Sequence, residues 1–442
     1  MKKLGAGKVG ILGLQHVLAM YAGAVIVPLI VGPAIGMTPK QLEFLISIDL
    51  FTCGIATLIQ VIGGRHFGIK LPVILGCTFT AVGPMIAIGN LQGITAIYGA
   101  IIASGIIVMI LAQFMNKVMK FFPPVVTGSV VTIIGVSLIP VAMNNAAGGL
   151  GSPTFGNIEN LLLALLTLVI IIVLNRFFTG FARAISVLLG LIVGTIAASI
   201  MGMVNFAAVG EASWFHIIQP FYFGLPTFNF SAILTMTLVA IVSMIEGTGV
   251  FLALGDVCDR KLTSQDIKKG LRAEGLAVAI GGIFNSFPYT TFSQNVGLVA
   301  LTKVKTRNVV ITAGVMLMIL GLLPKVAALT TIIPTAVLGG AMIPMFGMVI
   351  ASGIKMLSVV DFSRNENSLI VACSIGIGLG AAVVPVMFEK LPDNLRLLIE
   401  NGIVIGSITA VILNIIFNYK MLQTNEEQRY EQLKGDHSAE LI

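Results

Sequence analysis

The chain has 442 residues, of which 57% are hydrophobic and only 10% are charged, and its mean hydropathy is +1.02. Soluble domains typically carry about 25% charged residues, so this composition excludes a soluble domain and predicts a polytopic membrane protein. The net charge of +7 does not indicate a nucleic-acid partner, because the basic residues lie in short loops between apolar runs. The four cysteines show no metal-ligand spacing, so we expect neither a bound metal nor a disulfide framework.

The first apolar run follows a basic segment, residues 1–8, and contains Gln15 and His16. It continues for the roughly 20 residues of a full span, which favours a membrane helix over a cleaved signal peptide. Runs bounded by Gly, Pro and charge predict fourteen spans in all. Their centres lie near residues 21, 51, 79, 105, 132, 168, 193, 243, 277, 299, 315, 338, 376 and 408. We expect spans nine and eleven to be short, and 327–355 to form one helix interrupted around Pro334 and Gly339–Gly340.

The basic residues predict the orientation of these spans. If every span crosses, all but four of the 26 Lys and Arg residues fall on the side of the N-terminus. The four exceptions are Lys40, Lys325, Lys390 and Arg396. Since cytoplasmic loops carry an excess of Lys and Arg, both termini are predicted to be cytoplasmic.

The segment 284–307 places polar side chains at membrane depth around Pro288. Proline lacks an N–H and disfavours helix before it, so we expect extended backbone followed by a short helix that begins within 293–295. Broken backbone in a membrane is tolerated where it is buried or lines a cavity, and transporters use such half-helices to bind substrates. Span three repeats a Pro, a Phe with a hydroxyl residue, and a Gly, so spans three and ten are predicted to be half helix and half strand.

Two carboxylates stand out within apolar segments. Glu246 lies about midway along span eight, where a charge costs roughly 2.5 to 3.5 kcal/mol, so it is either a functional group facing a cavity or a protonated partner of another helix. Gly247 and Gly249 beside it would let a ligand approach. Glu274 enters span nine after a basic loop and is either a structural partner of a cation such as Arg272 or a carrier of a coupling proton.

The spacing Q-N-x-G-x-x-x-x-T-K, from Gln294 to Lys303, resembles the signature of the nucleobase-ascorbate transporter family, also called nucleobase:cation symporter-2. The likeness runs from about Leu12 to Tyr419 and is greatest to the bacterial xanthine and uric acid permeases. Further matching positions are Gln15–His16, Phe79–Thr80, Glu246 and Arg272–Gly275.

The resemblance implies an all-α membrane fold of fourteen segments in two inverted repeats of seven. Its core domain would comprise residues 1–116 (spans 1–4) and 211–323 (spans 8–11). Its gate domain would comprise residues 117–210 (spans 5–7) and 324–420 (spans 12–14). A cytoplasmic tail, 421–442, would follow, and family members commonly form homodimers through the gate domain.

The resemblance also implies the roles of the site residues. Glu246 would accept hydrogen bonds from the N–H groups of a nucleobase ring, and Gln294 would contact the substrate. Asn295 and His16 would organise the site, although a lone buried histidine is often a core residue. Glu274 would couple protons; the family often has aspartate there, which leaves the reach of the longer side chain open. Phe79, Thr80, Tyr289, Phe292 and Ser293 complete the candidate substrate-binding set, although aromatic rings in a membrane core more often serve packing.

These expectations predict a secondary transporter of the inner (plasma) membrane that imports a purine nucleobase, xanthine first, by proton symport. Uric acid import and an anion transporter of the same fold remain alternatives, and the residues leave proton against sodium coupling open. The absence of a Walker-type phosphate loop argues against ATP-driven transport. A channel would not concentrate its substrate, and no nucleophile or metal site indicates an enzyme. We expect no cofactor beyond the coupling proton, and the partners are the purine, protons and the lipid bilayer.

Overall fold

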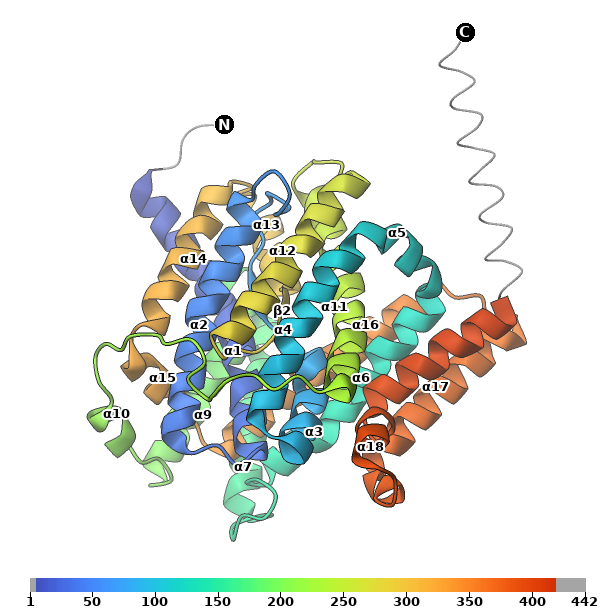
Figure 1. Cartoon of the computed structure of the whole chain (residues 1–442). Helices are drawn as coiled ribbons and strands as arrows, with labels where there is room; N and C mark the ends of the chain where they lie inside the picture. The colour runs from blue at the N-terminus through green and yellow to red at the C-terminus, as the bar shows by residue number, and fades with distance from the viewer. Residues whose placement is uncertain (1–4, 419–442) are drawn as a thin grey trace.

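The computed structural model describes residues 5–418, and their regular structure is almost wholly helical (Figure 1). The predicted tail, 421–442, lies outside the described residues. Within them, eight helices are long and apolar enough to cross a membrane, or up to ten spans form if each of two bent helix pairs counts as one. The eight are α1 (Ala6–Ala34), α2 (Pro39–Ile62), α4 (Ile94–Leu111), α6 (Pro124–Ala146), α7 (Ile158–Phe177), α11 (Phe230–Val257), α16 (Thr335–Leu357) and α17 (Asn365–Val383). A multi-pass membrane protein is therefore supported, and the count of fourteen stays a prediction.

The remaining elements are shorter. The helices are α3 (Val82–Gln92), α9 (Ser186–Ile200), α12 (Ser264–Ile283), α13 (Ser293–Thr302), α14 (Arg307–Gly321), α15 (Pro324–Thr331), α18 (Asp393–Ile399) and Gly402–Asn418. Single turns are α5 (Met115–Val118), α8 (Phe181–Ala184), α10 (Ala207–Glu211), η1 (Phe79–Ala81), η2 (Ala112–Phe114), η3 (Met119–Phe121) and η4 (Pro385–Phe388). Two strands, β1 (Leu75–Cys77) and β2 (Tyr289–Thr291), form the one sheet of the described chain.

The helices pack in two sets. In one set α2 contacts α1, α12 and α14, and α4 contacts α11 and α12; in the other, α16 contacts α6, α7 and α9, and α17 contacts α6. Glycines let helices of the first set approach closely: a Cβ at Gly54 of α2 would lie 2.5 Å from the Gly314 carbonyl oxygen of α14, and one at Gly105 of α4 would lie 2.6 Å from Ala279 N of α12. The first set contains both strands' neighbours and therefore holds the centre of the molecule.

The predicted interruption of 327–355 is right at Pro334 and wrong at Gly339–Gly340. Pro334 stands just before α16, but α16 runs through both glycines without a break. A Cβ at Gly339 would lie 2.0 Å from Ala146 N of α6, and one at Gly340 would lie 2.3 Å from the Ala164 carbonyl oxygen of α7. These glycines thus serve close helix packing and not bending. The sharp bend lies earlier, where α14 and α15 meet at 80°.

Loops that the charge pattern places on one side of the membrane contact one another. Lys305, before α14, pairs with Asp259, after α11. Arg260 donates to the Ile69 carbonyl over 3.3 Å, and Gly68 N–H donates to the Lys269 carbonyl over 2.9 Å. The loops after α2, α11 and α13 therefore share one end of the molecule, as the predicted topology requires.

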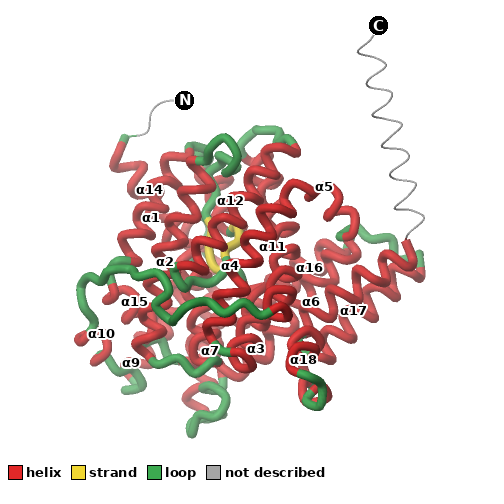
Figure 2. The backbone as a smooth tube through the Cα atoms, viewed as in Figure 1, coloured by secondary structure: helices red, strands yellow, loops and turns green. Residues whose placement is uncertain are grey.

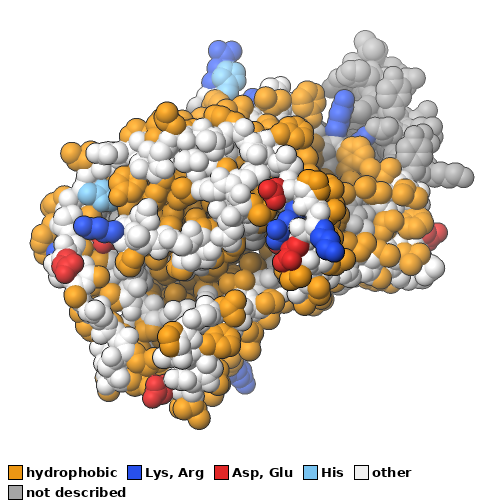
Figure 3. All heavy atoms as spheres, turned by 60° about the horizontal axis from the view of Figure 1, so that its bottom comes forward, with side chains coloured by type: hydrophobic (Ala, Val, Ile, Leu, Met, Phe, Trp, Pro, Cys, Tyr) orange, Lys and Arg blue, Asp and Glu red, His pale blue; other side chains and the backbone are white. Residues whose placement is uncertain are grey.

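The outer surface is largely apolar. Figure 3 shows hydrophobic side chains spread over one face, with only scattered charged groups between them. On α7, for example, Leu161, Leu162 and Leu165 are about half exposed, at 48%, 55% and 54%. Burial of such side chains in lipid would remove this surface from water, which suits a chain embedded in a bilayer.

Candidate functional site

The two strands meet in the middle of the helices, where Figure 2 shows them as short extended segments enclosed by helix. They pair antiparallel, with Gly76 opposite Thr290. Thr78 N–H donates to the Pro288 carbonyl over 2.9 Å, and Phe292 N–H donates to the Ile74 carbonyl over 3.0 Å. Pairing satisfies backbone groups that hydrocarbon could not hydrogen-bond. The predicted broken form of spans three and ten is confirmed.

A half-helix begins directly after each strand. η1 and α3 follow β1, and α13 begins at Ser293 after β2, within the predicted range. Thr78 and Phe292 are the residues at which these helices start. The first N–H groups of a helix lack intrahelical acceptors and carry partial positive charge, so these ends can face polar substrate atoms.

The side chains on the first turn of α13 divide into two groups. Ser293 and Gln294 are exposed, so their polar atoms are free to meet a ligand. Asn295 is 1% exposed and donates through Nδ2 to the His16 carbonyl over 3.1 Å; the same nitrogen lies 3.0 Å from His16 Nδ1. His16 and Asn295 thus tie α1 to α13. This contact is what a site-organising role requires, and the role itself stays a prediction.

Glu246 lies on α11, which contacts α13, η1 and β2 and thus both broken spans. Its side chain is partly exposed, Gly247 is buried, and Gly249 is exposed with no atom within 4 Å of an added Cβ. An added Cβ at Gly247 would lie 2.9 Å from Glu274 Oε2. The Glu274 carboxyl therefore lies against the turn of α11 that carries Glu246.

Glu274 borders a small cavity between α4, α11 and α12. The cavity has a volume of about 30 Å³, room for one or two waters and far too small for a purine. Ser104, Ser243 and Tyr289 also line it. Glu274 Oε1 and Ser243 Oγ are buried without a hydrogen-bond partner among the described residues. This space suits water or a proton beside Glu274, while a purine would need the accessible side of α11.

The aromatic and hydroxyl candidates are less accessible. Phe79 is partly buried and meets Phe346 of α16 edge-on, with ring centroids 5.6 Å apart. Thr80 is buried, with its hydroxyl 2.9 Å from the Thr78 hydroxyl. Tyr289 is 2% exposed, and Phe292 is 6% exposed. The Phe292 ring covers Gly76, where a Cβ would lie 2.6 Å from Cζ. The accessible candidates are therefore Glu246, Gln294, Ser293 and Phe79.

Sequence reasoning missed Asp49, a carboxylate in the middle of α2. It is 2% exposed and accepts a hydrogen bond from Phe287 N–H over 2.8 Å, just before the break at Pro288. An acidic residue inside an apolar span was the available signal, the same one that singled out Glu246. Among residues 5–418, no cluster of three His, Cys, Asp or Glu side chains is placed to hold a metal ion.

Three relatives match nearly the whole chain. The nucleobase transporter PlUacP of Paenibacillus larvae is 62% identical over 98% of this chain and 99% of its own. The xanthine permease of Bacillus subtilis is 61% identical over 94% of each chain, and the uric acid permease PucK of the same organism is 60% identical over 92% of this chain and 95% of its own.

Solved structures share the fold at low sequence identity. The transmembrane domain of the cyanobacterial bicarbonate transporter BicA has a TM-score of 0.63 at 16% identity, covering 90% of this chain and 97% of its own. The murine anion transporter Slc26a9, in its inward-facing state, has a TM-score of 0.62 at 13% identity, covering 94% of this chain and 69% of its own. The protein thus has the fold of these transporters.

A family model described as the Permease family matches residues 7–387. Its match and the identities of 60% and above agree with the Q-N-x-G-x-x-x-x-T-K signature. Transport, and not catalysis, is what the family and these relatives perform. The chain therefore belongs to the nucleobase-ascorbate transporter family, also called nucleobase:cation symporter-2.

Proposed function

We propose that the protein imports a purine nucleobase, xanthine first, by proton symport across the inner membrane. The observation that carries this proposal is the position of α11 against both broken spans, with Glu246 partly exposed. A carboxylate accepts hydrogen bonds only, which complements the ring N–H groups of a purine dione. The relatives named for nucleobase, xanthine and uric acid transport support the same substrate class.

Gln294 supplies the second half of the recognition. Its amide offers one acceptor and one double donor, which match the alternating N–H and C=O groups of an imide edge. Asn295 and His16 hold the first turn of α13 so that this amide stays accessible. Phe79, Thr80, Ser293, Phe292 and Tyr289 shape the surroundings. A base with mismatched groups would leave buried polar atoms unpaired, at about 1 to 3 kcal/mol each.

Transport follows from movement of one helix set against the other. In this account Glu274 takes up a proton, the purine binds against Glu246 and Gln294, and the core domain moves relative to the gate domain. Both ligands then leave toward the cytoplasm, where both chain termini lie. The assignment of residues 1–116 and 211–323 to the core, and of 117–210 and 324–420 to the gate, is part of this proposal, as is a homodimer formed through the gate.

Two alternatives differ in substrate. Uric acid carries the same imide edge, and a relative named as a uric acid permease is 60% identical. An anion is favoured only by the fold shared with bicarbonate and anion transporters, and a carboxylate at Glu246 would repel it.

Competition for binding distinguishes these substrates. We expect purified protein to bind radiolabelled xanthine saturably, with unlabelled xanthine and then urate as the best competitors, and with uracil and bicarbonate ineffective. Urate outcompeting xanthine would support the uric acid reading. No purine binding, together with bicarbonate binding, would replace the proposal with the anion-transporter reading.

A further inference from the structure

Asp49 is a buried carboxyl that the proposed mechanism does not use. It lies about halfway along α2, deep within a span, and is 2% exposed. A carboxyl at such a position is costly and needs a compensating interaction. The contacts of Asp49 lead directly to the break in span ten.

The backbone between α12 and β2 has one amide that no carbonyl satisfies. Asn285 N–H donates to the Gly282 carbonyl over 3.2 Å, and Ser286 N–H donates to the Gly281 carbonyl over 2.9 Å. Pro288 has no N–H. Phe287, which is 0% exposed, donates its N–H to Asp49 Oδ1 over 2.8 Å. Since an unpaired buried amide costs about 1 to 3 kcal/mol, Asp49 completes the hydrogen bonding of the break.

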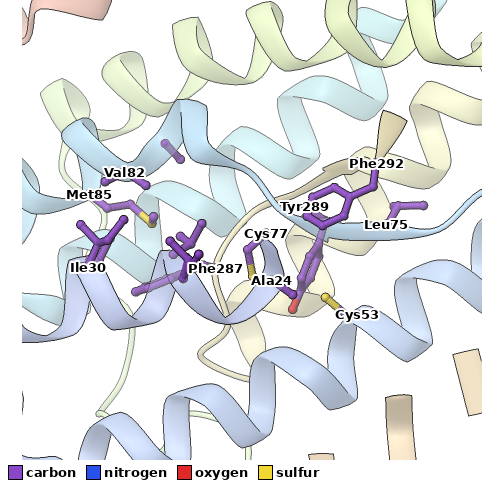
Figure 4. Close-up of a cluster of buried hydrophobic side chains, with 14 of the residues drawn as sticks. Ala24, Ile30, Cys53, Leu75, Cys77, Val82, Met85, Phe287, Tyr289 and Phe292 are labelled. Carbon is purple, nitrogen blue, oxygen red and sulfur yellow. The ribbon is translucent and has the colours of Figure 1, made fainter. Parts of the chain in front are cut away.

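The same face of α2 also holds the residue after the proline. Thr52, three positions beyond Asp49 and hence on the same helix face, shares a hydrogen bond between its hydroxyl and the Tyr289 hydroxyl. Figure 4 shows Tyr289 extending from its strand toward Cys53 of α2, with Cys77 of β1 close by. One turn of α2 thus grips the chain on both sides of Pro288.

This grip lies upstream of the candidate substrate contacts. Tyr289 begins β2, β2 pairs with β1, and α13 with Gln294 follows within two residues of the strand's end. A shift of Phe287 and Tyr289 would therefore move both strands and the first turn of α13. The two broken spans and α2 form one mechanical unit.

We propose that Asp49 and Thr52 are positioning residues of the substrate site, which hold the broken end of span ten so that Gln294 faces the substrate bound at Glu246. This inference rests on the proposed function. Asp49 Oδ2 has no hydrogen-bond partner, so a single acceptor atom carries the contact with Phe287. An asparagine, which keeps that acceptor, should therefore replace Asp49, whereas an alanine should not.

The test measures radiolabelled xanthine binding to purified variants, together with their melting temperatures in detergent. We expect Asp49→Ala to raise the xanthine Kd about tenfold or more, and Asp49→Asn to stay within about threefold of wild type. Thr52→Val, which keeps the side-chain volume, should also raise Kd, whereas Thr52→Ser should not. Ser47→Ala is the matched control, because Ser47 is a buried hydroxyl of α2 outside the grip and is 0% exposed.

A double mutant separates positioning from general stability. If Asp49 acts through α13, the Kd increase of Asp49→Ala combined with Gln294→Ala will be smaller than the product of the single increases. A lower melting temperature with an unchanged Kd in Asp49→Ala, or in Thr52→Val if Asp49→Ala does not fold, would overturn the proposal. Failure of wild type to bind any purine would instead refute the proposed function and this inference with it.

Discussion

Replacing Glu246 with glutamine will abolish saturable purine uptake while leaving the protein in the membrane. The amide has nearly the shape of the carboxylate, but its NH₂ group would point a donor at a donor of the purine ring. The lost hydrogen bond and the two unpaired buried groups together reduce affinity by about 100-fold or more. The measurement is initial-rate uptake of radiolabelled xanthine, with membrane protein quantified by immunoblot.

Glu211→Gln is the control for this variant, because Glu211 is an exposed carboxylate at the end of α10. Its uptake should equal that of wild type. Wild-type uptake by Glu246→Gln would remove Glu246 from the substrate site and return it to the structural interpretation, a protonated side chain bonded to another helix.

Glu274→Gln will bind xanthine but will fail to accumulate it against a gradient. The amide fits the same buried space against Gly247, but it cannot take up and release a proton. Without that step the transporter should still exchange internal for external purine, since exchange requires no net proton movement. Accumulation in energised membrane vesicles should therefore fall to the equilibrium level, while counterflow exchange and xanthine Kd stay within a few-fold of wild type.

Glu274→Asp is the informative comparison, because it keeps the carboxyl and shortens its reach by one methylene. We expect it to retain gradient-driven accumulation at a reduced rate. Accumulation by Glu274→Gln that a protonophore still collapses would contradict the coupling role. Glu274 would then be a structural carboxyl beside the small cavity that it shares with Ser104 and Ser243.

The broken spans could be predicted because their signals are local. Proline at 288 prevents helix, and the polar cluster after it would be costly in lipid unless buried in protein. The pairing of β1 with β2 could not be predicted, because the Pro-to-Phe spacing differs between spans three and ten and the register depends on tertiary contacts. The His16–Asn295 contact came from the family resemblance; the residues alone left His16 as an ordinary core histidine.

Two misses share a physical cause, since each depends on what a side chain packs against. Gly339 and Gly340 resembled a helix break but are places where α16 meets α6 and α7 backbone to backbone. Asp49 had the signal of a buried charge, yet its meaning depends on the Phe287 amide, 238 positions away in sequence. Tyr289 and Phe292 were candidates for stacking on a flat ring, and their burial depends on β1 and α2 in the same way.

The central claim is tested most directly by xanthine uptake into cells that express this chain and lack their own purine permeases. The account predicts saturable uptake that concentrates xanthine inside the cell, that collapses with a protonophore, and that persists when sodium is replaced. Uptake that requires sodium would contradict proton coupling. No uptake of any purine by protein shown to reach the membrane would contradict the account as a whole.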